Sequence, residues 1–290
     1  YEIVNGLVGS EMCIRDRNNK VSLEILKNFP SIQMGYEMAV LSLNGKNSFE
    51  LFPSKFTDGT DSIPINGLIW MGEIDFMKAQ IKQKIDEGFD CLKLKIGALP
   101  FEKELELLSE IRNEFSKDEM IIRVDANGGF SPDDVMDKLN KLANLDIHSI
   151  EQPIKANQRK RMSLICSKTP VPIALDEELI GVFDPLDRES LLDQVSPQYI
   201  ILKPSLLGGF KSCEHWIELA EQRSIGWWVT SALESNIGLN AIAQWTYQLG
   251  ITSHQGLGTG GLFSNNIDSP LQVKLGQLKF NINSCWNTKF

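Results

Sequence analysis

Histidine and closely spaced cysteine, the residues that most often bind zinc, are scarce in this sequence. Its three histidines, His148, His215 and His254, have spacings that match no metal site, and none has a nucleophile partner in a recognisable motif. The five cysteines are odd in number, widely separated and form no Cys-x-x-Cys pair. We therefore expect reduced thiols and a cytoplasmic location, with neither a zinc site nor a disulfide framework.

Other protein classes are excluded by further absences. No apolar run is long enough to cross a bilayer, and no secretory signal pattern opens the sequence. The net charge of −9 argues against a nucleic-acid partner, since phosphate binding needs a basic face, but a local lysine cluster can still hold a small anion. Gly208 and Gly209 lack the further glycines of a phosphate-binding loop. Because the first residue is Tyr1, we expect the sequence to be part of a longer chain.

The first 61 residues show little regular pattern. Residues 7–17 follow neither the helical nor the strand period and look like a translated sequencing adapter, so we give them no structural weight. Residues 21–43 have helical apolar spacing that is broken at Pro30, and Ser31 is the expected N-cap of the helix that follows. Residues 44–61 are rich in Asn, Gly, Ser and Asp, as is typical of a loop.

From Pro64 onward, strand and helix patterns alternate at intervals of roughly 25–30 residues. The expected strands are short apolar or β-branched runs, at 64–70, 91–96, 120–126, 149–152, 171–176, 199–203, 226–230 and 251–255. Eight strands that alternate with helices predict an α/β fold in which parallel strands close into a TIM-like barrel. The last segment, 262–290, lies outside this alternation, and we expect it to pack against the N-terminal helices.

Two lysines interrupt the second expected strand. Side chains alternate between the faces of a strand, so Lys93 and Lys95 point to one side while Leu92, Leu94 and Ile96 point to the other. Ammonium groups on a buried face are costly unless anions lie nearby. The pair therefore indicates either a solvated edge strand or a buried site that contains acids.

Acidic residues follow three successive strands of the predicted barrel. Asp125, Glu151 and Asp176 each end an apolar run, and functional groups of such barrels lie where the strands end. Each acid alone is explained as a helix cap or a solvated charge. Together they would repel one another unless a cation joined them, and oxygen ligands without His or Cys favour Mg²⁺, with Mn²⁺ as the alternative. Glu177 and Glu178 follow Asp176 directly; strand alternation places Asp176 and Glu178 on one side and Glu177 outward or behind the ligands.

A third lysine, Lys203, ends the strand expected to lie across the barrel from Lys93 and Lys95. A lysine beside another lysine and near a metal has its neutral form favoured, as a general base requires. The metal would hold a substrate carboxylate and stabilise the ene-diolate formed when the adjacent carbon loses its proton, an arrangement already described for the enolase superfamily. The small-molecule partner expected from this site is therefore a carboxylate.

Over residues 64–261 this ordered set of charged residues resembles the enolase superfamily in its muconate-lactonizing branch. The set comprises Lys93, Lys95, Asp125, Glu151, Asp176 and Lys203. Within that branch, residues 230–239 (TSALESNIGL) and 256–260 (GLGTG) look like the o-succinylbenzoate synthase family. The resemblance implies a (β/α)7β barrel with an α+β capping domain. It also implies dehydration of 2-succinyl-6-hydroxy-2,4-cyclohexadiene-1-carboxylate to 2-succinylbenzoate in menaquinone biosynthesis.

The same resemblance implies a role for each residue of the set. Lys95 would remove the ring proton and then, once protonated, assist loss of the hydroxyl, while Lys203 would stabilise the ene-diolate from the opposite face. Lys93 would contact the substrate carboxylate and tune Lys95. Asp125, Glu151 and Asp176 would bind the metal, and Ser231, Gly256 and Gly258 would line the succinyl side of the substrate.

The sequence departs from the family before Val21, where the capping sheet and its closing loop have no counterpart. We therefore expect three parts: a remnant of the capping domain at 1–61, a modified barrel at 62–261, and a segment at 262–290 that completes the cap. A truncated cap would exclude water poorly, so the expected alternative is a catalytically impaired fragment.

Two further functions stay open. A dipeptide epimerase or N-acylamino acid racemase of the same superfamily also needs lysines on both faces of its substrate. Dipeptide epimerases tend to have Asp-x-Asp after the eighth strand, where this sequence has Gly258-Thr259-Gly260. A non-catalytic barrel whose acids bind a structural ion, or nothing, is the other alternative. The sequence leaves open whether the chain forms a homo-oligomer.

Overall fold

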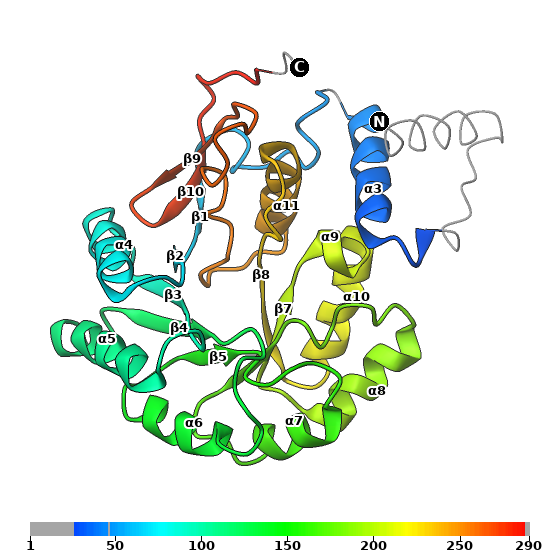
Figure 1. The fold of residues 1–290 in the computed structure, drawn as a ribbon. Helices are drawn as coiled ribbons and strands as arrows, with labels where there is room; N and C mark the ends of the chain where they lie inside the picture. Colours follow the sequence, from blue (N-terminus) through cyan, green and yellow to red (C-terminus); the bar gives the residue numbers. More distant parts are fainter. Residues whose placement is uncertain (1–25, 46, 288–290) are drawn as a thin grey trace.

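The computed structural model describes residues 26–45 and 47–287, so the adapter-like stretch 7–17 lies outside the described residues (Figure 1). Its elements, in chain order, are α3 (Pro30–Asn44), β1 (Ser62–Pro64), β2 (Gly67–Ile69), α4 (Ile74–Asp86), β3 (Cys91–Lys95), α5 (Phe101–Glu114), β4 (Ile121–Asp125), α6 (Val135–Ala143), β5 (Ser149–Glu151), α7 (Arg159–Cys166), β6 (Ile173–Leu175), α8 (Pro185–Val195), β7 (Tyr199–Leu202), α9 (Pro204–Leu207), α10 (Gly209–Glu221), β8 (Gly226–Val229), α11 (Asn236–Gln248), β9 (Leu271–Lys274) and β10 (Gln277–Phe280). Among the described residues, no helix has the length and apolarity needed to span a membrane.

Seven parallel strands form a curled sheet within the described part of the chain, in the order β2-β3-β4-β5-β6-β7-β8. Each strand is paired with the next one in the sequence, and the connecting helices cover the outside of the curl (Figure 1). Sequential parallel pairing with helical crossovers is the arrangement of a β/α barrel. The predicted α/β fold with a TIM-like barrel is confirmed.

The strand expected at 251–255 is not a regular strand. Single parallel bridges close the barrel there, between Ile65 and Gln255 and between Thr230 and Gly256. The buried side chain of Gln255 takes the place of part of the missing ladder: its Oε1 accepts a hydrogen bond from the Val229 N–H at 2.8 Å, and its Nε2 donates to the Ser253 carbonyl at 2.7 Å. A side-chain amide thus bonds to an edge where strand backbone was expected.

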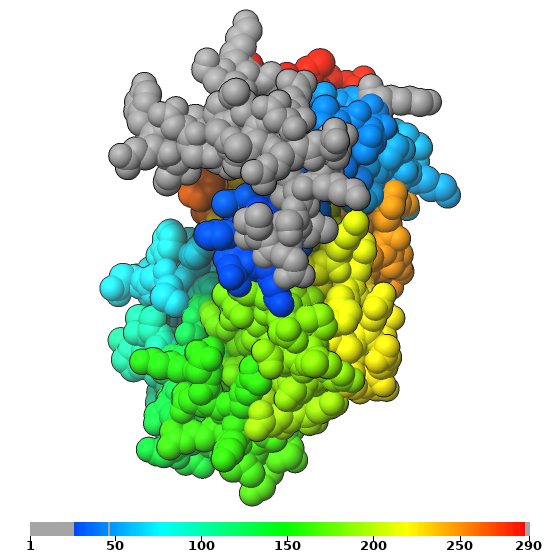
Figure 2. Space-filling view, turned by 90° about the vertical axis from the view of Figure 1, so that its right-hand side faces the viewer, coloured from blue at the N-terminus to red at the C-terminus, as the bar shows by residue number. Residues whose placement is uncertain are grey.

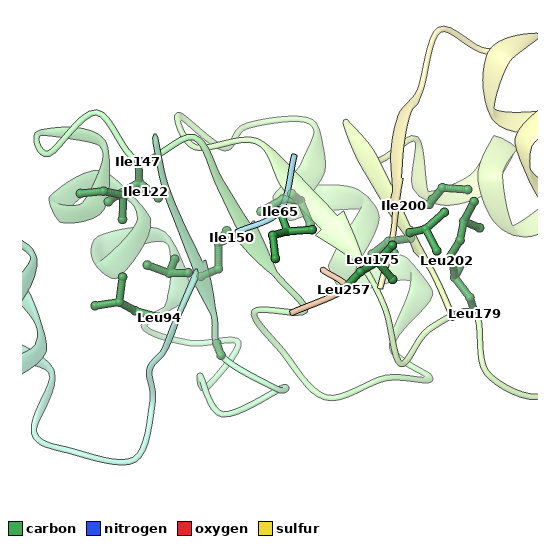
Figure 3. Close-up of a cluster of buried hydrophobic side chains, with 14 of the residues drawn as sticks. Ile65, Leu94, Ile122, Ile147, Ile150, Leu175, Leu179, Ile200, Leu202 and Leu257 are labelled. Carbon is green, nitrogen blue, oxygen red and sulfur yellow. The ribbon is translucent and has the colours of Figure 1, made fainter. Parts of the chain in front are cut away.

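The apolar positions of the strands build the core between sheet and helices. Leu94, Ile122, Ile150, Leu175 and Ile200 are fully buried (Figure 3). Because strand side chains alternate, the residues between these positions point into the barrel, and several of them are charged. The polar groups inside the barrel are therefore surrounded by a continuous apolar layer.

A small antiparallel sheet lies at one end of the barrel, with the strand order β1-β10-β9. It divides the strand expected at 64–70: residues 62–64 pair with β10, and residues 67–69 join the barrel beside β3. The C-terminal segment also contacts residues before the barrel, because Trp286 stacks on Phe49 with ring centroids 4.4 Å apart.

Helix α3 packs against α9 and α10, at the side of the barrel shown in Figure 2. The expected N-cap was wrong: Phe29 is the N-cap, Pro30 is the first helical residue, and Ser31 lies inside the helix. Proline suits the first turn because it lacks the N–H that would be unpaired there. The Ser31 hydroxyl instead donates to the Ser205 carbonyl at 2.8 Å, which joins α3 to the segment after β7.

Candidate active site

The strand register places three charged residues side by side. Lys95 at the end of β3 is paired with Asp125 at the end of β4, and Asp125 is paired with Glu151 at the end of β5. Asp176 directly follows β6, and Lys203 directly follows β7. All five residues thus lie at the carboxyl ends of neighbouring strands, with one lysine on each side of the three acids.

Lys93 lies one layer deeper on β3 and is almost fully buried, with 6% of its surface exposed. Its ammonium group is 3.0 Å from Asp125 Oδ2 and also donates to Glu151 Oε2. Burial alone would lower the pKa of Lys93, but the charges of Glu151 and Asp125 outweigh it and raise that pKa above its usual value. Lys93 is therefore a buried, charged residue, and β3 is an inner strand of the sheet, not a solvated edge.

Asp125 is the shared partner of both lysines on β3. Its Oδ2 atom is 2.7 Å from Lys95 Nζ, and Lys95 also donates to Asn127 Oδ1 at 2.6 Å. Burial raises the pKa of Asp125, but Lys93 and Lys95 outweigh this effect and hold the pKa well below its usual range. Asp125 is thus ionised and available as an oxygen ligand.

Lys203 lies on the other side of the acids. Its ammonium group forms an ion pair with Asp176 Oδ2, and its side chain is 16% exposed, close to the 17% of Lys95. Burial lowers the pKa of Lys203, but Asp176 and Glu151 raise it by more. The expectation that neighbouring lysines favour the neutral form therefore does not apply to Lys93 or Lys203 here, because acids surround both.

In Glu151, the effects of burial and of a neighbouring acid on the pKa outweigh the effect of the nearby lysine. Burial and the charge of Asp125 raise the pKa of Glu151 well above its usual value, despite the nearby ammonium group of Lys93. Its Oε1 atom is buried and has no hydrogen-bond partner among the described residues. A buried carboxylate oxygen without a partner is unfavourable unless a proton or a cation satisfies it.

Of the three acids at 176–178, Glu178 points in a direction that alternation did not predict. The chain leaves the strand at Leu175 and turns, so Glu178 is directed away and accepts a hydrogen bond from the Asn157 N–H at 3.2 Å. Glu177 lies nearer Asp125 and Asp176: its Oε1 accepts from Asn127 Nδ2 at 2.9 Å, and its Oε2 is buried without a partner in the described part of the chain. Placing Glu178 on the side of Asp176 was wrong, because residues beyond the ladder do not alternate.

The residues expected to line the succinyl side lie after β8 and in the closing segment. The Ser231 hydroxyl is 2.7 Å from Thr259 Oγ1 and accepts a hydrogen bond from the Leu233 N–H at 3.0 Å. A Cβ atom at Gly256 would lie 2.2 Å from Thr230 Oγ1, whereas one at Gly258 would come no closer than 3.3 Å to a side-chain methyl group. Gly256 is therefore needed for close packing on Thr230.

Sequence reasoning listed Asn127 and Glu177 among the polar groups at the strand ends without a role in binding, and it did not place Gln152 in this site. Asn127 bridges Lys95 and Glu177, and Gln152 donates and accepts hydrogen bonds within the loops that follow β5 and β6. The Asp-x-Asn pattern at 125–127 was the available signal for Asn127. Nothing in the sequence distinguishes Gln152 from an ordinary buried amide.

The acids fit a divalent cation by their chemistry. All three are oxygen donors of the kind that Mg²⁺ and Mn²⁺ prefer, and the unpartnered Glu151 Oε1 has no other ligand. Among residues 26–45 and 47–287, no three Asp, Glu, His or Cys side chains converge closely enough to hold an ion. Instead, Lys93 and Lys203 form ion pairs with one oxygen of each acid: Lys93 with Asp125 Oδ2 and Glu151 Oε2, and Lys203 with Asp176 Oδ2.

Comparison with known proteins identifies the class that this barrel and its charged residues define. The chain belongs to the enolase C-terminal domain-like family, whose family model matches residues 76–281. Enzymes of the enolase superfamily typically depend on a divalent metal.

Within that family the chain is similar to o-succinylbenzoate synthase. The enzyme of that name from Desulfotalea psychrophila is 54% identical over 250 residues, which are 86% of this chain and 68% of that protein. The crystal structure of MenC from the same organism matches with a TM-score of 0.82 and 49% identity, covering 95% of this chain and 74% of that chain. The family resemblance inferred from the residues is confirmed.

Other members of the superfamily are less similar. Muconate lactonizing enzyme from Pseudomonas putida matches with a TM-score of 0.72 and 26% identity, over 85% of this chain and 69% of that chain. The L-amino acid-D/L-Glu epimerase of Francisella philomiragia is 30% identical over 195 residues, 66% of this chain and 53% of that protein.

Proposed function

We propose that this chain is a hydro-lyase that dehydrates 2-succinyl-6-hydroxy-2,4-cyclohexadiene-1-carboxylate to 2-succinylbenzoate, the o-succinylbenzoate synthase reaction of menaquinone biosynthesis. The single observation that carries the proposal is the 54% identity to the Desulfotalea psychrophila enzyme. Support comes from the row of Lys95, Asp125 and Glu151 at the strand ends.

The proposed roles follow from how each lysine is held. Lys95 ends β3 beside Asp125, and its amine nitrogen is proposed to accept the proton from the ring carbon that carries the carboxylate. The ammonium group then returns a proton to the departing hydroxyl, water leaves, and the ring becomes aromatic. Lys203, kept charged by Asp176, stabilises the negative charge that develops on the substrate carboxylate. Lys93 is held away from proton transfer by its two acids and acts through its charge.

We propose Mg²⁺ as the cofactor, with Mn²⁺ as a substitute, held by Asp125, Glu151 and Asp176. A bound cation would supply further positive charge opposite the substrate carboxylate as the adjacent carbon loses its proton. Ser231, Gly256 and Gly258 are proposed to line the succinyl side, where Ser231 offers a hydroxyl and Gly256 allows close packing on Thr230.

Incubation with the cyclohexadiene substrate and Mg²⁺ tests the proposal. We expect the ultraviolet absorbance of the aromatic product to appear, and to be abolished when EDTA removes the cation. If wild-type protein leaves the substrate unchanged at saturating Mg²⁺, the proposed activity is wrong.

Racemisation or epimerisation is the second candidate. It is favoured by the lysines on opposite sides of the acids and by the similarity to the Francisella epimerase. The segment Gly258-Thr259-Gly260 offers no carboxylate to hold a substrate amino group. A parallel incubation with an N-acylamino acid in D₂O distinguishes the two, because a racemase exchanges the α-proton whereas a dehydratase alone does not.

We also propose the domain organisation, location and partner. Residues 62–261 form the barrel, 1–61 are the remnant of a capping domain and 262–290 complete it, as the stacking of Trp286 on Phe49 supports. The described cysteines are free thiols, which favours the cytoplasm. The partner is a small carboxylate.

A further inference from the structure

Gln152 has an unusual backbone for a buried residue. It directly follows Glu151, is 0% exposed and has a φ of +39°. This left-handed conformation is uncommon for residues other than glycine and persists only where surrounding contacts determine it. The contacts of the Gln152 side chain show what determines it.

The amide of Gln152 uses its full hydrogen-bonding capacity. Its Oε1 accepts from the backbone N–H groups of Asp176 and Glu178, both at 3.2 Å. Its Nε2 donates to the Ile154 carbonyl at 3.0 Å and to Glu178 Oε2 at 3.4 Å. The two donated bonds fix which way the amide faces, so the oxygen is directed at Asp176.

These bonds lie where the regular sheet ends. Strand β6 stops at Leu175, and the last backbone bond between β5 and β6 runs from the Gln152 N–H to the Ala174 carbonyl at 2.9 Å. Asp176 lies beyond that ladder, and the Gln152 side chain holds its backbone instead. The Gln152 carbonyl also accepts from the Gly128 N–H at 2.6 Å, in the loop that follows Asp125. Gln152 therefore contacts the loops that carry all three proposed metal ligands.

We propose that Gln152 is a positioning residue that holds Asp176 in place beside Glu151 for cation binding. The inference rests on the proposed cation site and extends it to a residue that touches neither the cation nor the substrate. Residues that orient metal ligands typically contribute about 10- to 100-fold to metal affinity.

Gln198 provides a matched control at the other end of β6. Its Oε1 accepts from the Ile173 N–H at 2.9 Å, and its Nε2 donates to the Cys166 carbonyl at 3.2 Å. Gln198→Met therefore removes the same kind of amide bond from the same strand, far from Asp176. A purely structural role for Gln152 predicts similar effects of the two substitutions.

The experiment measures Mn²⁺ affinity by calorimetry, without substrate, for wild type, Gln152→Met, Gln198→Met and Asp176→Asn. We expect Gln152→Met to weaken Mn²⁺ binding by about 10- to 100-fold. Gln198→Met is expected to lower the melting temperature while leaving the affinity within about twofold of wild type. Gln152→Asn, one methylene shorter but still an amide, should show the same loss as Gln152→Met and serves where Met prevents folding.

Two negative results have different meanings. If wild type does not bind Mn²⁺, or Asp176→Asn binds it equally well, the proposed cation site is wrong and the inference falls with it. If wild type binds and Asp176→Asn does not, but both Gln152 variants bind like wild type, only the positioning role of Gln152 is overturned.

Discussion

Replacing Lys93 with methionine tests whether its ammonium group neutralises the buried acids. In the structure this group is 3.0 Å from Asp125 Oδ2 and also contacts Glu151. Methionine fills a similar volume but leaves two carboxylates facing each other inside the barrel. Burial and Asp125 already raise the pKa of Glu151, and Lys93 counteracts this effect. Losing Lys93 therefore makes the ionised form of Glu151 still less favourable.

The expected cost follows from the burial of all three groups. Removing one partner from a buried ion pair destabilises proteins by about 3–5 kcal/mol, because the remaining charge is uncompensated. Solvent screening reduces this little, since the side chains of Lys93, Asp125 and Glu151 are 7%, 0% and 2% exposed. We expect the free energy of unfolding of Lys93→Met to fall by this amount at pH 7 in the absence of divalent cations.

Urea unfolding with and without Mg²⁺ measures the effect. A cation that binds only the folded state at 100 times its dissociation constant adds about 2.7 kcal/mol. The variant should gain more from Mg²⁺ than wild type does, because the cation replaces the lost positive charge. Leu94→Ala is the control: it removes a fully buried neighbour on the opposite face, should cost about 2–5 kcal/mol, and should gain from Mg²⁺ as wild type does. If Lys93→Met is as stable as wild type in the absence of a divalent cation, the reasoning is refuted.

Two further predictions concern other parts of the barrel. Burial and the charge of Arg123 lower the pKa of His148 from 6.5 to about 4, so the folded protein holds this imidazole neutral while the unfolded chain protonates it. The His148 contribution to stability is therefore complete above pH 6.5 and falls by up to about 1.4 kcal/mol per pH unit from there toward pH 4, and His148→Phe should flatten the urea-unfolding profile in that window by the same amount. If the unfolding free energy of His148→Phe falls as steeply with decreasing pH as that of wild type, His148 is not the group responsible. Gly256→Ala should lower the free energy of unfolding by about 1–3 kcal/mol, because its methyl group would lie 2.2 Å from Thr230 Oγ1, whereas Gly258→Ala should be nearly neutral. Equal melting temperatures for the two alanine variants would show that the contact with Thr230 is not constraining.

The central row of the site could be predicted because it depends on local rules. The apolar pattern locates each strand, and alternation determines that Lys93 and Lys95 share a face. Parallel strands in consecutive order then bring their carboxyl ends together, which is why Lys95, Asp125 and Glu151 occupy matching register positions. No long-range information was needed beyond the expectation of a barrel.

The features that sequence reasoning missed depend on side chains from distant segments. The eighth strand is replaced by single bridges, and the Gln255 side chain adds a hydrogen bond to the edge of β8. The direction of Glu178 is set by a turn after Leu175 and by its contact with the Asn157 N–H. Each depends on tertiary hydrogen bonds that local periodicity does not encode.

The start of α3 shows a different limit. Serine is a good N-cap, but Pro30 takes the first helical position and moves the boundary, which leaves Ser31 free to bond to the Ser205 carbonyl. The serine N-cap signal and the proline first-turn signal predict different starts for α3, and the helix begins at the proline.

The most direct test of the account is the reaction of Lys95→Ala with the cyclohexadiene carboxylate at saturating Mg²⁺. Lys95 Nζ and Asp125 Oδ2 are 2.7 Å apart at the strand ends, and the variant removes the side chain whose amine is assigned as base. With a circular dichroism spectrum like that of wild type, the variant should form the aromatic product about 10²- to 10⁴-fold more slowly, the range expected for loss of a general base. Turnover at the wild-type rate would contradict the assignment of Lys95 and, with it, the proposed chemistry of this site.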